Sequence, residues 1–274
     1  DRLMDKRCRI CVLRYTDKII REFNLEKHPG WLSEITDLKK RVDEFEYTMD
    51  YHRELGDILT KHLGHEDHFK NKKRELNRKM EDKSSVIRET IQKSDDPFYT
   101  AVEYSISGNL LDLAQGNDIE DIEIKGSEDE IDRKTLKRLK KELKKRKKLL
   151  IIGDNSGEIV MDMLLVDEIK RLNPKIEITY FVRDKPFLND TVMNDLDDFM
   201  LSRALDFKPY GYYSEEDFKK LDEFKLIISK GQANLEKFFE ISDKRFFFLF
   251  VVKCDVVGEM LDSTKGRHTI VRGG

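Results

Sequence analysis

The architecture of this chain rests on one run of ten residues, Leu149-Leu150-Ile151-Ile152-Gly153-Asp154-Asn155-Ser156-Gly157-Glu158. Four apolar residues end abruptly at a polar turn, and apolar residues then recur at helical spacing over 159–172. This pattern predicts a buried parallel strand, a tight turn and a helix. Ligands of open α/β sheets bind just beyond the carboxyl ends of the strands, which is where this turn would lie. Alternatively, the turn is only a helix start that Asp154 or Ser156 caps.

Three later apolar segments also end in polar turns. They are predicted strands at 176–182, 226–229 and 246–252, and residues 269–272 are predicted to add an edge strand. Helical segments separate them, so the crossovers should be right-handed and the sheet mainly parallel. All four polar turns would then lie at one edge of the sheet. The predicted fold class is α/β, with a helical N-terminal region packed on a Rossmann-like parallel sheet that has a mixed edge.

The chain before the first strand is predicted to be mainly helical. Apolar residues recur at helical spacing from about residue 10 to residue 93, and small and apolar residues at 98–114 predict a buried helix. Asn109 and Asp112 share one face of that helix, where they either face the core or point toward the polar turns. We predict three parts: an all-helical domain at 1–115, a charged linker with an amphipathic helix at 116–148, and an α/β domain at 149–274.

A further helix is predicted between the second and third strands. Asp190 or Thr191 would cap it, it would run to about Leu205, and a turn would follow at 209–213. No strand is predicted in this part of the chain.

The polar turns hold side chains suited to a divalent cation. The carboxylates of Asp154 and Asp190 and the amide carbonyl of Asn155 form a set of hard oxygen donors. Such a set suits Mg²⁺ or Mn²⁺ and leaves positions for water and a phosphate oxygen.

The same turns carry groups suited to a phosphate. Gly157 and Gly231, together with helix N-terminal amides, suit an oxyanion, and Lys253 and Arg183 would add positive charge. The chain has no Ser-His-Asp order and no HExxH motif, and its glycines match neither GxGxxG after the first strand nor a Walker A loop. A nicotinamide or ATP site is therefore poorly supported.

Two other groups of metal-ligand residue types occur in the N-terminal half. Cys8 and Cys11 form a C-x-x-C that is either half of a zinc site, a redox pair or two helix-packed thiols. Structural zinc normally needs four protein ligands and no second C-x-x-C follows, so we favour packed thiols. His62, His65 and His68 lie among acidic residues, and we favour a polar helix connection over a metal site.

Composition and charge restrict the class of protein. The 274 residues carry a formal net charge of −3, so the chain has no global basic field of the kind that nucleic-acid binders show. No apolar run approaches the ~20 residues of a membrane span. The first residues show no signal-peptide pattern, and three cysteines do not make a disulfide framework. We expect a cytoplasmic protein without a membrane or nucleic-acid partner, and the sequence leaves its oligomeric state open.

Four motifs, in their order and spacing, resemble the DUF89 family of metal-dependent damage-control phosphatases. They are Gly153-Asp154-Asn155-Ser156-Gly157-Glu158, Arg183-x-x-Pro186-x-x-Asn189-Asp190, Lys230-Gly231-Gln232-Ala233-Asn234-Leu235-Glu236 and Lys253-Cys254. The N-terminal C-x-x-C and the modest length are similar to the archaeal and bacterial branch of that family. The resemblance covers the C-terminal half strongly and extends more weakly to Ser107-Gly108-Asn109-x-x-Asp112 and the helical half.

This resemblance implies a divalent metal, Mn²⁺, Mg²⁺, Co²⁺ or Ni²⁺, held by residues that match Asp154, Asn155 and Asp190. It implies hydrolysis of small phosphomonoesters, such as sugar phosphates or damaged phosphometabolites, with Asp154 as the leading candidate to assist the chemistry. The predicted phosphate and substrate contacts are Ser156, Gly157, Glu158, Arg183, Asn189, Gly231, Asn234 and Lys253.

Two other functions stay as alternatives. An S-adenosylmethionine-dependent methyltransferase would need a Gly-rich loop after the first strand, which residues 153–157 match poorly. A non-enzymatic nucleic-acid binder would use the Lys- and Arg-rich segment 133–148, where Leu136, Leu139 and Leu143 recur at helical spacing. The acidic tract just before that segment offers a nearby counter-charge, so we favour a solvated helix packed on the sheet.

Overall fold

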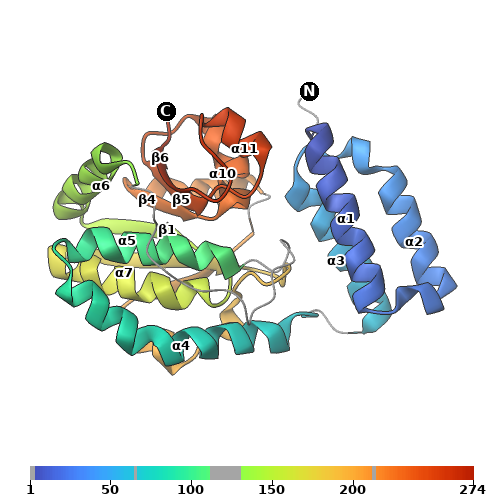
Figure 1. Ribbon diagram of the computed structural model, residues 1–274, viewed down its shortest axis with the longest axis horizontal. Coiled ribbons are helices and arrows are strands. Elements are labelled where there is room, and N and C mark those ends of the chain that lie inside the picture. Colours follow the sequence, from blue (N-terminus) through green and yellow to red (C-terminus); the bar gives the residue numbers. More distant parts are fainter. Residues whose placement is uncertain (1–3, 65–66, 112–130, 212–213) are drawn as a thin grey trace. The chain divides into compact units, whose positions relative to one another are not determined.

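The computed structural model describes residues 4–64, 67–111, 131–211 and 214–274 (Figure 1). The chain divides into two units, Asp1–His68 and Phe69–Gly274. This division falls earlier than the predicted limit at residue 115. The reason is that α4 (Lys70–Lys93) and α5 (Pro97–Ser107) pack against α7 (Glu158–Leu172), which belongs to the second unit.

The first unit is helical, as predicted. Its elements are α1 (Lys6–Glu22), η1 (Leu25–Lys27), α2 (Pro29–Lys40), η2 (Val42–Glu44) and α3 (Thr48–Leu63). α1 begins after Asp5, whose side chain accepts a hydrogen bond from the N–H of Arg7, and α2 begins with Pro29, which has no N–H to satisfy. The apolar stripes of the three helices meet in a small core of Val12, Ile19, Ile35, Leu38 and Leu55.

Two groups of metal-ligand residue types lie in the first unit, at Cys8 and Cys11 and at residues 62–68. Cys8 and Cys11 lie on α1, and neither forms a disulfide. His62 pairs with Glu34, with 2.9 Å between Nε2 and Oε1, and His65 lies outside the described residues. Across the ranges that the structure describes, no group of three or more His, Cys, Asp or Glu side chains is arranged to hold a metal.

The second unit is built on a six-stranded sheet. Its strands are β1 (Lys148–Ile152), β2 (Glu177–Arg183), β3 (Asp206–Tyr210), β4 (Ile227–Lys230), β5 (Phe246–Val251) and β6 (His268–Arg272). The order is β3-β2-β1-β4-β5-β6, parallel from β3 to β5, with β6 antiparallel at the edge. This confirms the predicted α/β class and the mixed edge. The strand order reverses between β1 and β4, so their carboxyl ends flank the topological switch point where ligands of such folds bind.

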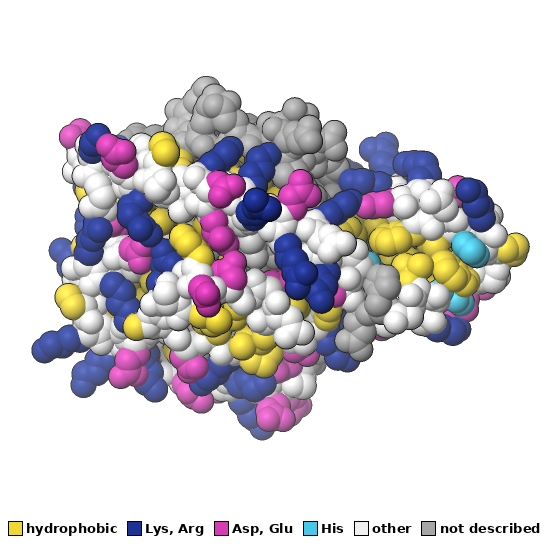
Figure 2. Space-filling view, turned by 90° about the horizontal axis from the view of Figure 1, so that it is seen from below, with side chains coloured by type: hydrophobic (Ala, Val, Ile, Leu, Met, Phe, Trp, Pro, Cys, Tyr) yellow, Lys and Arg dark blue, Asp and Glu magenta, His cyan; other side chains and the backbone are white. Residues whose placement is uncertain are grey.

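Helices cover both faces of this sheet (Figure 1). The remaining elements are η3 (Gly108–Leu111), α6 (Arg133–Lys145), η6 (Met193–Asp195), α8 (Asp198–Leu201), α9 (Glu215–Lys220), η7 (Leu221–Glu223), α10 (Gln232–Phe238), η8 (Phe239–Ile241) and α11 (Asp255–Met260). On one face α5 and α7 pack together, with α4 on their outer side, and α10 packs on β4 and β5 from the opposite face. The outer face that includes α4 shows Lys and Arg side chains interspersed with Asp and Glu (Figure 2). Among the described helices, none combines the length and apolar character needed to cross a membrane.

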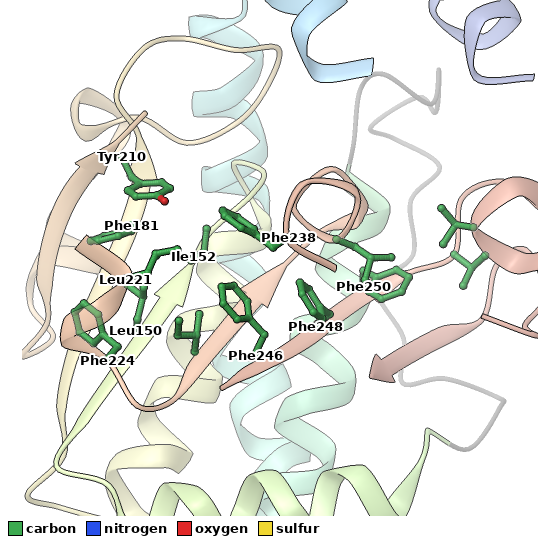
Figure 3. Packing of buried hydrophobic residues seen from close by; sticks show 14 residues of the cluster. Leu150, Ile152, Phe181, Tyr210, Leu221, Phe224, Phe238, Phe246, Phe248 and Phe250 are labelled. Carbon is green, nitrogen blue, oxygen red and sulfur yellow. The ribbon is translucent and has the colours of Figure 1, made fainter. Parts of the chain in front are cut away.

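An aromatic core lies between the sheet and α10 (Figure 3). All six residues of β5 are buried, as expected for a strand that is covered on both faces. The rings of Phe246 and Phe248 stack with centroids 5.5 Å apart, and Phe238 of α10 lies 5.3 Å from Phe246. Phe181 and Tyr210 stack at 4.6 Å on neighbouring strands. This packing fixes the strand ends from which the polar turns project.

The segment between β2 and β3 differs from the prediction. Instead of a helix that reaches Leu205, the chain forms η6 and the four-residue α8, which is capped by Asp197. Asp190 and Thr191 cap no helix, because they lie alongside the turn after β1. The strand β3 was missed because most of its residues are exposed or half-buried, so the sequence there lacks the apolar run of a buried strand.

Two acids lie together where Asp197, the N-cap residue of α8, meets Glu81 of α4. Burial, followed by the hydrogen bond and negative charge of Asp197, raises the pKa of Glu81 from 4.5 to about 7. The folded protein therefore keeps a proton at Glu81 that the unfolded chain loses between these two pH values. The stability that this site contributes is present below pH 4.5 and is lost as the pH rises through about 7.

We predict that Glu81→Gln raises the thermal unfolding temperature at pH 8 by a few degrees relative to wild type, because the amide has no charge to bury. The difference should shrink toward pH 5, where wild-type Glu81 is protonated in the folded state. The matched control is Glu75→Gln, since Glu75 is exposed on the same helix. Unfolding temperatures that coincide for Glu81→Gln and wild type at pH 8 would contradict this account.

Candidate active site

The turn after β1 places Asp154 at the carboxyl edge of the sheet. β1 ends at Ile152, and the N–H of Gly153 donates to the carbonyl oxygen of Phe181 on β2 at 2.9 Å. A Cβ atom at Gly153 would lie 2.4 Å from the ring of Tyr180, so only glycine lets the chain pass that ring. Asp154 follows and is buried, with 7% of its surface exposed.

The loop after β2 lies beside this turn. Asn155 and Asp190 form an isolated antiparallel bridge, and the N–H of Thr191 donates to the carbonyl oxygen of Asp154 at 2.9 Å. Arg183, the last residue of β2, holds Asp190 with 2.5 Å between Nε and Oδ2. The structure therefore brings together the three residues that the sequence proposes as metal ligands.

Helix α7 starts without a side-chain cap. Its N-cap residue is Gly157, at φ +80°, and neither Asp154 nor Ser156 takes that role. The N–H of Gly157 donates to Oδ1 of Asn77 at 2.6 Å, and the N–H of Ser156 donates to the carbonyl oxygen of Asn189 at 2.8 Å. The predicted capping role of Ser156 is wrong, because the chain turns through Gly157 and Ser156 is bonded to the loop after β2.

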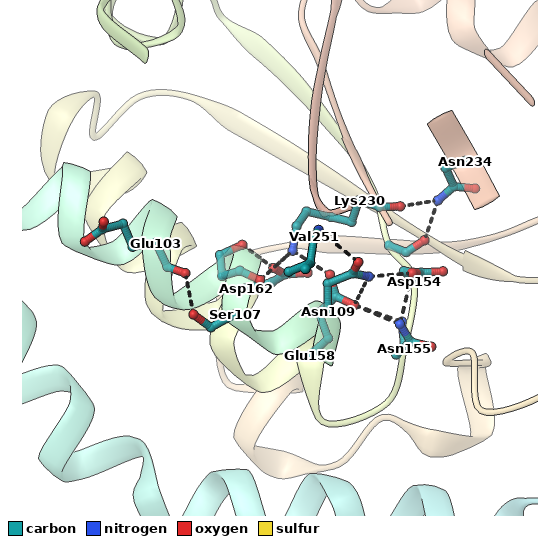
Figure 4. A network of polar contacts seen from close by, with 12 residues as sticks. Glu103, Ser107, Asn109, Asp154, Asn155, Glu158, Asp162, Lys230, Asn234 and Val251 are labelled. Atoms are coloured by element: carbon teal, nitrogen blue, oxygen red, sulfur yellow. Dashed lines mark hydrogen bonds and ion pairs between the residues drawn. The ribbon is translucent and has the colours of Figure 1, made fainter. Parts of the chain in front are cut away.

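The carboxylate of Asp154 and the amide of Asn155 each direct one oxygen away from their hydrogen-bond partners (Figure 4). Oδ2 of Asp154 accepts hydrogen bonds from Nδ2 of Asn109 and Nδ2 of Asn155, both at 2.9 Å. Nδ2 of Asn155 also donates to Oε2 of Glu158 at 3.0 Å. Within the described part of the chain, Oδ1 of Asp154 and Oδ1 of Asn155 accept no hydrogen bond. These two oxygens are available to a ligand.

Negative charge is concentrated at this edge of the sheet. Burial raises the pKa of Asp154 well above its ordinary value, and the carboxylates of Asp190 and Glu158 raise it further, against the charges of Lys253 and Arg183. Five buried carboxylates face four buried cations here: Asp154, Glu158, Asp162, Asp190 and Asp195 against Lys73, Arg183, Lys230 and Lys253. A divalent cation would offset the excess, and the oxygen donors are those that Mg²⁺ and Mn²⁺ prefer, so the residues fit such a metal.

The turn after β4 approaches Asp154 closely. Gly231 has φ +83°, and a Cβ atom there would lie 1.9 Å from Oδ2 of Asp154. The N–H of Gly231 donates to the carbonyl oxygen of Leu249 on β5 at 3.1 Å. Gly231 thus makes room for the Asp154 carboxylate, whereas its N–H is already engaged and does not serve the oxyanion role that the sequence suggested.

Several other predicted phosphate contacts hold the turns together instead. Nδ2 of Asn234 donates to two backbone carbonyl oxygens, at 3.0 and 2.7 Å, and Nδ2 of Asn189 donates to the carbonyl oxygen of Leu111 at 2.8 Å. Glu158 has no exposed surface, and its Oε1 accepts a hydrogen bond at 2.7 Å from Lys230, with which it forms an ion pair. We therefore interpret these side chains as parts of the scaffold around Asp154.

Lys253 is the best-placed group for a phosphate. It follows β5, has 9% of its surface exposed, and its charge acts on Asp154. Its backbone N–H donates to Oε1 of Gln232 at 2.9 Å, which ties the turn after β5 to the start of α10. A cation in this position is what the predicted phosphate role requires.

Two residues of α4 support the site and were not predicted. Lys73 is fully buried, with Nζ 2.5 Å from Oδ2 of Asp195 and 3.5 Å from the carbonyl oxygen of Asp190. Nδ2 of Asn77 donates to the carbonyl oxygen of Asp195 at 3.3 Å. A signal was present, because Lys73 and Asn77 stand at i and i+4 beside Leu76, on the stripe of the helix that is buried. A polar side chain within such a stripe needs a buried partner.

Comparisons with known proteins show the family to which the chain belongs. The damage-control phosphatase ARMT1-like domain matches residues 4–269. The damage-control phosphatase PH1575 of Pyrococcus horikoshii is 31% identical over 229 residues, which cover 78% of this chain and 77% of that protein. A damage-control phosphatase of Archaeoglobus fulgidus is 33% identical over 229 residues, which cover 75% and 74%. The crystal structure of the DUF89 family protein PH1575 from P. horikoshii aligns with a TM-score of 0.76 and 25% identity, over 100% of both chains. With its fold and the order of its polar turns, the chain belongs to the damage-control phosphatase ARMT1-like family, also called DUF89.

Proposed function

We propose that this protein is a metal-dependent phosphatase of small phosphomonoesters, such as sugar phosphates or damaged phosphometabolites. One observation carries the proposal: Oδ1 of Asp154 and Oδ1 of Asn155 accept no hydrogen bond from the described residues, in a turn that is bridged to Asp190 and holds an excess of buried carboxylates. The names of the two relatives, both damage-control phosphatases, support the same class of reaction.

Asp154, Asn155 and Asp190 would hold the metal, for which Mn²⁺, Mg²⁺, Co²⁺ and Ni²⁺ are the candidates. When bound, such a cation polarises a phosphoryl oxygen and lowers the pKa of a bound water. Three protein ligands leave coordination positions for water and for the substrate, as hard cations in phosphate-processing sites commonly have.

The protein's own groups would bind and orient the phosphate. Lys253, beside Asp154, supplies positive charge for the phosphate oxygens. Two amides hold Asp154 by Oδ2, so its other oxygen keeps a fixed direction. The ion pair with Arg183 holds Asp190 in the same way. Because these partners are already in place, little rearrangement is needed when the substrate binds.

Neither alternative function gains a comparable observation. A methyltransferase would need backbone N–H groups of the turn after β1 for its cofactor, but the N–H of Gly157 is bonded to Asn77. The basic helix α6 buries Leu136, Leu139 and Leu143, and one of its lysines, Lys140, pairs with Asp96. This is the arrangement of a solvated helix packed on its own unit.

We predict that Asp154→Asn lowers metal-dependent phosphate release by more than about 100-fold, since even the outer partners of metal ligands commonly contribute 10- to 100-fold. The same change should raise the unfolding temperature of the metal-free protein, because it removes a buried charge that Asp190 and Glu158 repel. Phosphate release by Asp154→Asn at the wild-type rate would overturn the assignment.

A suitable control for that experiment is Asp167→Asn. Asp167 lies on the same helix as Glu158 but forms partly exposed ion pairs with Arg88 and Arg203, at 3.1 and 3.3 Å. Loss of these pairs should cost little stability and leave phosphate release near the wild-type rate.

A second prediction concerns the close approach of Gly231 to Asp154. Gly231→Ala would place a methyl group against Oδ2 of Asp154, so it should lower phosphate release by more than about 100-fold, a loss like that expected when a metal site is distorted. The matched control is Gly266→Ala, because Gly266 also has a positive φ (+89°) but nothing lies within 4 Å of its Cβ position. Both changes should incur backbone strain of about 1–3 kcal/mol, measured by chemical denaturation. Equal effects of the two variants on activity would show that the contact with Asp154 is unimportant.

A further inference from the structure

A buried ion pair lies directly behind the proposed metal ligands (Figure 4). The side chains of Lys230 and Glu158 are both fully buried, with 2.7 Å between Nζ and Oε1. Lys230 also donates to Oδ1 of Asp162 at 2.7 Å and to the carbonyl oxygen of Ser105 at 2.9 Å. Burying such a pair adds little net stability compared with apolar residues, because the desolvation of the charges offsets their attraction. The function of this ion pair is therefore sought in how it orients the side chains next to it.

The other oxygen of Glu158 faces the site. Oε2 accepts hydrogen bonds from Nδ2 of Asn155 at 3.0 Å and from Nδ2 of Asn109 at 3.1 Å. Both amides also donate to Oδ2 of Asp154. Each NH₂ group therefore donates one hydrogen to Asp154 and the other to Glu158. A flipped Asn155 amide would direct its carbonyl oxygen at both carboxylates, which repel it. The amide orientation of Asn155 is therefore set, with Oδ1 turned away from Glu158 and Asp154.

We propose that Glu158, anchored by Lys230, is a positioning residue that presents Oδ1 of Asn155 to the metal. The inference rests on the proposed function and replaces the predicted role of Glu158 as a substrate contact, since that side chain has no exposed surface. Outer partners of metal ligands commonly contribute 10- to 100-fold to metal affinity, because they fix the orientation of the ligand atom.

A variant of Asp162 can distinguish the positioning of Asn155 from the mere neutralisation of the Lys230 charge. Asp162 faces the same ammonium at the same 2.7 Å, but its other hydrogen bonds come from the hydroxyls of Ser105 and Tyr180, each at 2.6 Å. Asp162→Asn therefore removes a buried charge beside Lys230 and leaves the hydrogen bonds of Asn155 in place.

The test measures the affinity of the metal-free full chain for Mn²⁺, by electron paramagnetic resonance of the free Mn²⁺ and by calorimetry. Glu158→Gln should weaken Mn²⁺ binding about 10- to 100-fold, because Asn155 loses one of its two carboxylate acceptors. Asp162→Asn should weaken it less than about threefold, since no partner of a proposed ligand changes. Glu158→Asp keeps the charge near Lys230 but withdraws the carboxylate from the amide, so it should also weaken binding. Circular dichroism and thermal unfolding check that each variant is folded.

Two results would overturn the positioning role. One is unchanged Mn²⁺ affinity in folded Glu158→Gln or Glu158→Asp, and the other is an equal loss in Glu158→Gln and Asp162→Asn, which would assign the effect to the ion pair alone. If Glu158→Gln does not fold, Glu158→Asp decides, because it retains the counter-charge of Lys230. A wild-type chain that binds no Mn²⁺ would instead contradict the proposed function itself, so the two failures are distinguishable.

Discussion

The burial of several carboxylates at one edge of the sheet is the constraint on which the rest of the site depends. Asp154, Glu158, Asp162 and Asp190 are all buried there. Ionised carboxylates removed from water are costly unless each has a hydrogen-bonded or charged partner. Lys230 serves two of them, Arg183 serves Asp190, and two amides serve Asp154. This need for partners explains why most polar side chains of the turns form hydrogen bonds within the protein. It also explains why two oxygens, Oδ1 of Asp154 and Oδ1 of Asn155, are left for a ligand.

The fold meets that demand with groups that lie far apart in the sequence. The strand order reverses between β1 and β4, so the turns that carry Asp154 and Gly231 meet at the switch point. Helix α5 leads into Asn109, and α4 adds Lys73 and Asn77, which bind the loop after β2 and the turn after β1. Helices α4 and α5 therefore support the candidate site, and their packing on α7 keeps its geometry.

The strands with apolar runs, their parallel arrangement and the meeting of their polar turns at one edge of the sheet could be predicted, because hydrophobic pattern and the βα rule determine them. The edge strand β3 could not, since it is largely exposed and has no such run. The sequence also indicated the residue types of the site but not how each polar group is used. The sequence predicts that Asn234 and Gly157 bind phosphate. In the structure, however, the side-chain NH₂ of Asn234 and the backbone N–H of Gly157 donate to other groups of the protein. Such choices depend on distances between distant segments, which residue spacing in the sequence does not reveal.

The most direct test of the metal site is anomalous diffraction from crystals of the wild-type protein grown or soaked with Mn²⁺. The account predicts one strong anomalous peak within about 2.5 Å of Oδ1 of Asp154, Oδ1 of Asn155 and a carboxylate oxygen of Asp190. An occupied manganese position elsewhere, for example at Cys8 and Cys11, with no peak between these three side chains, would contradict it.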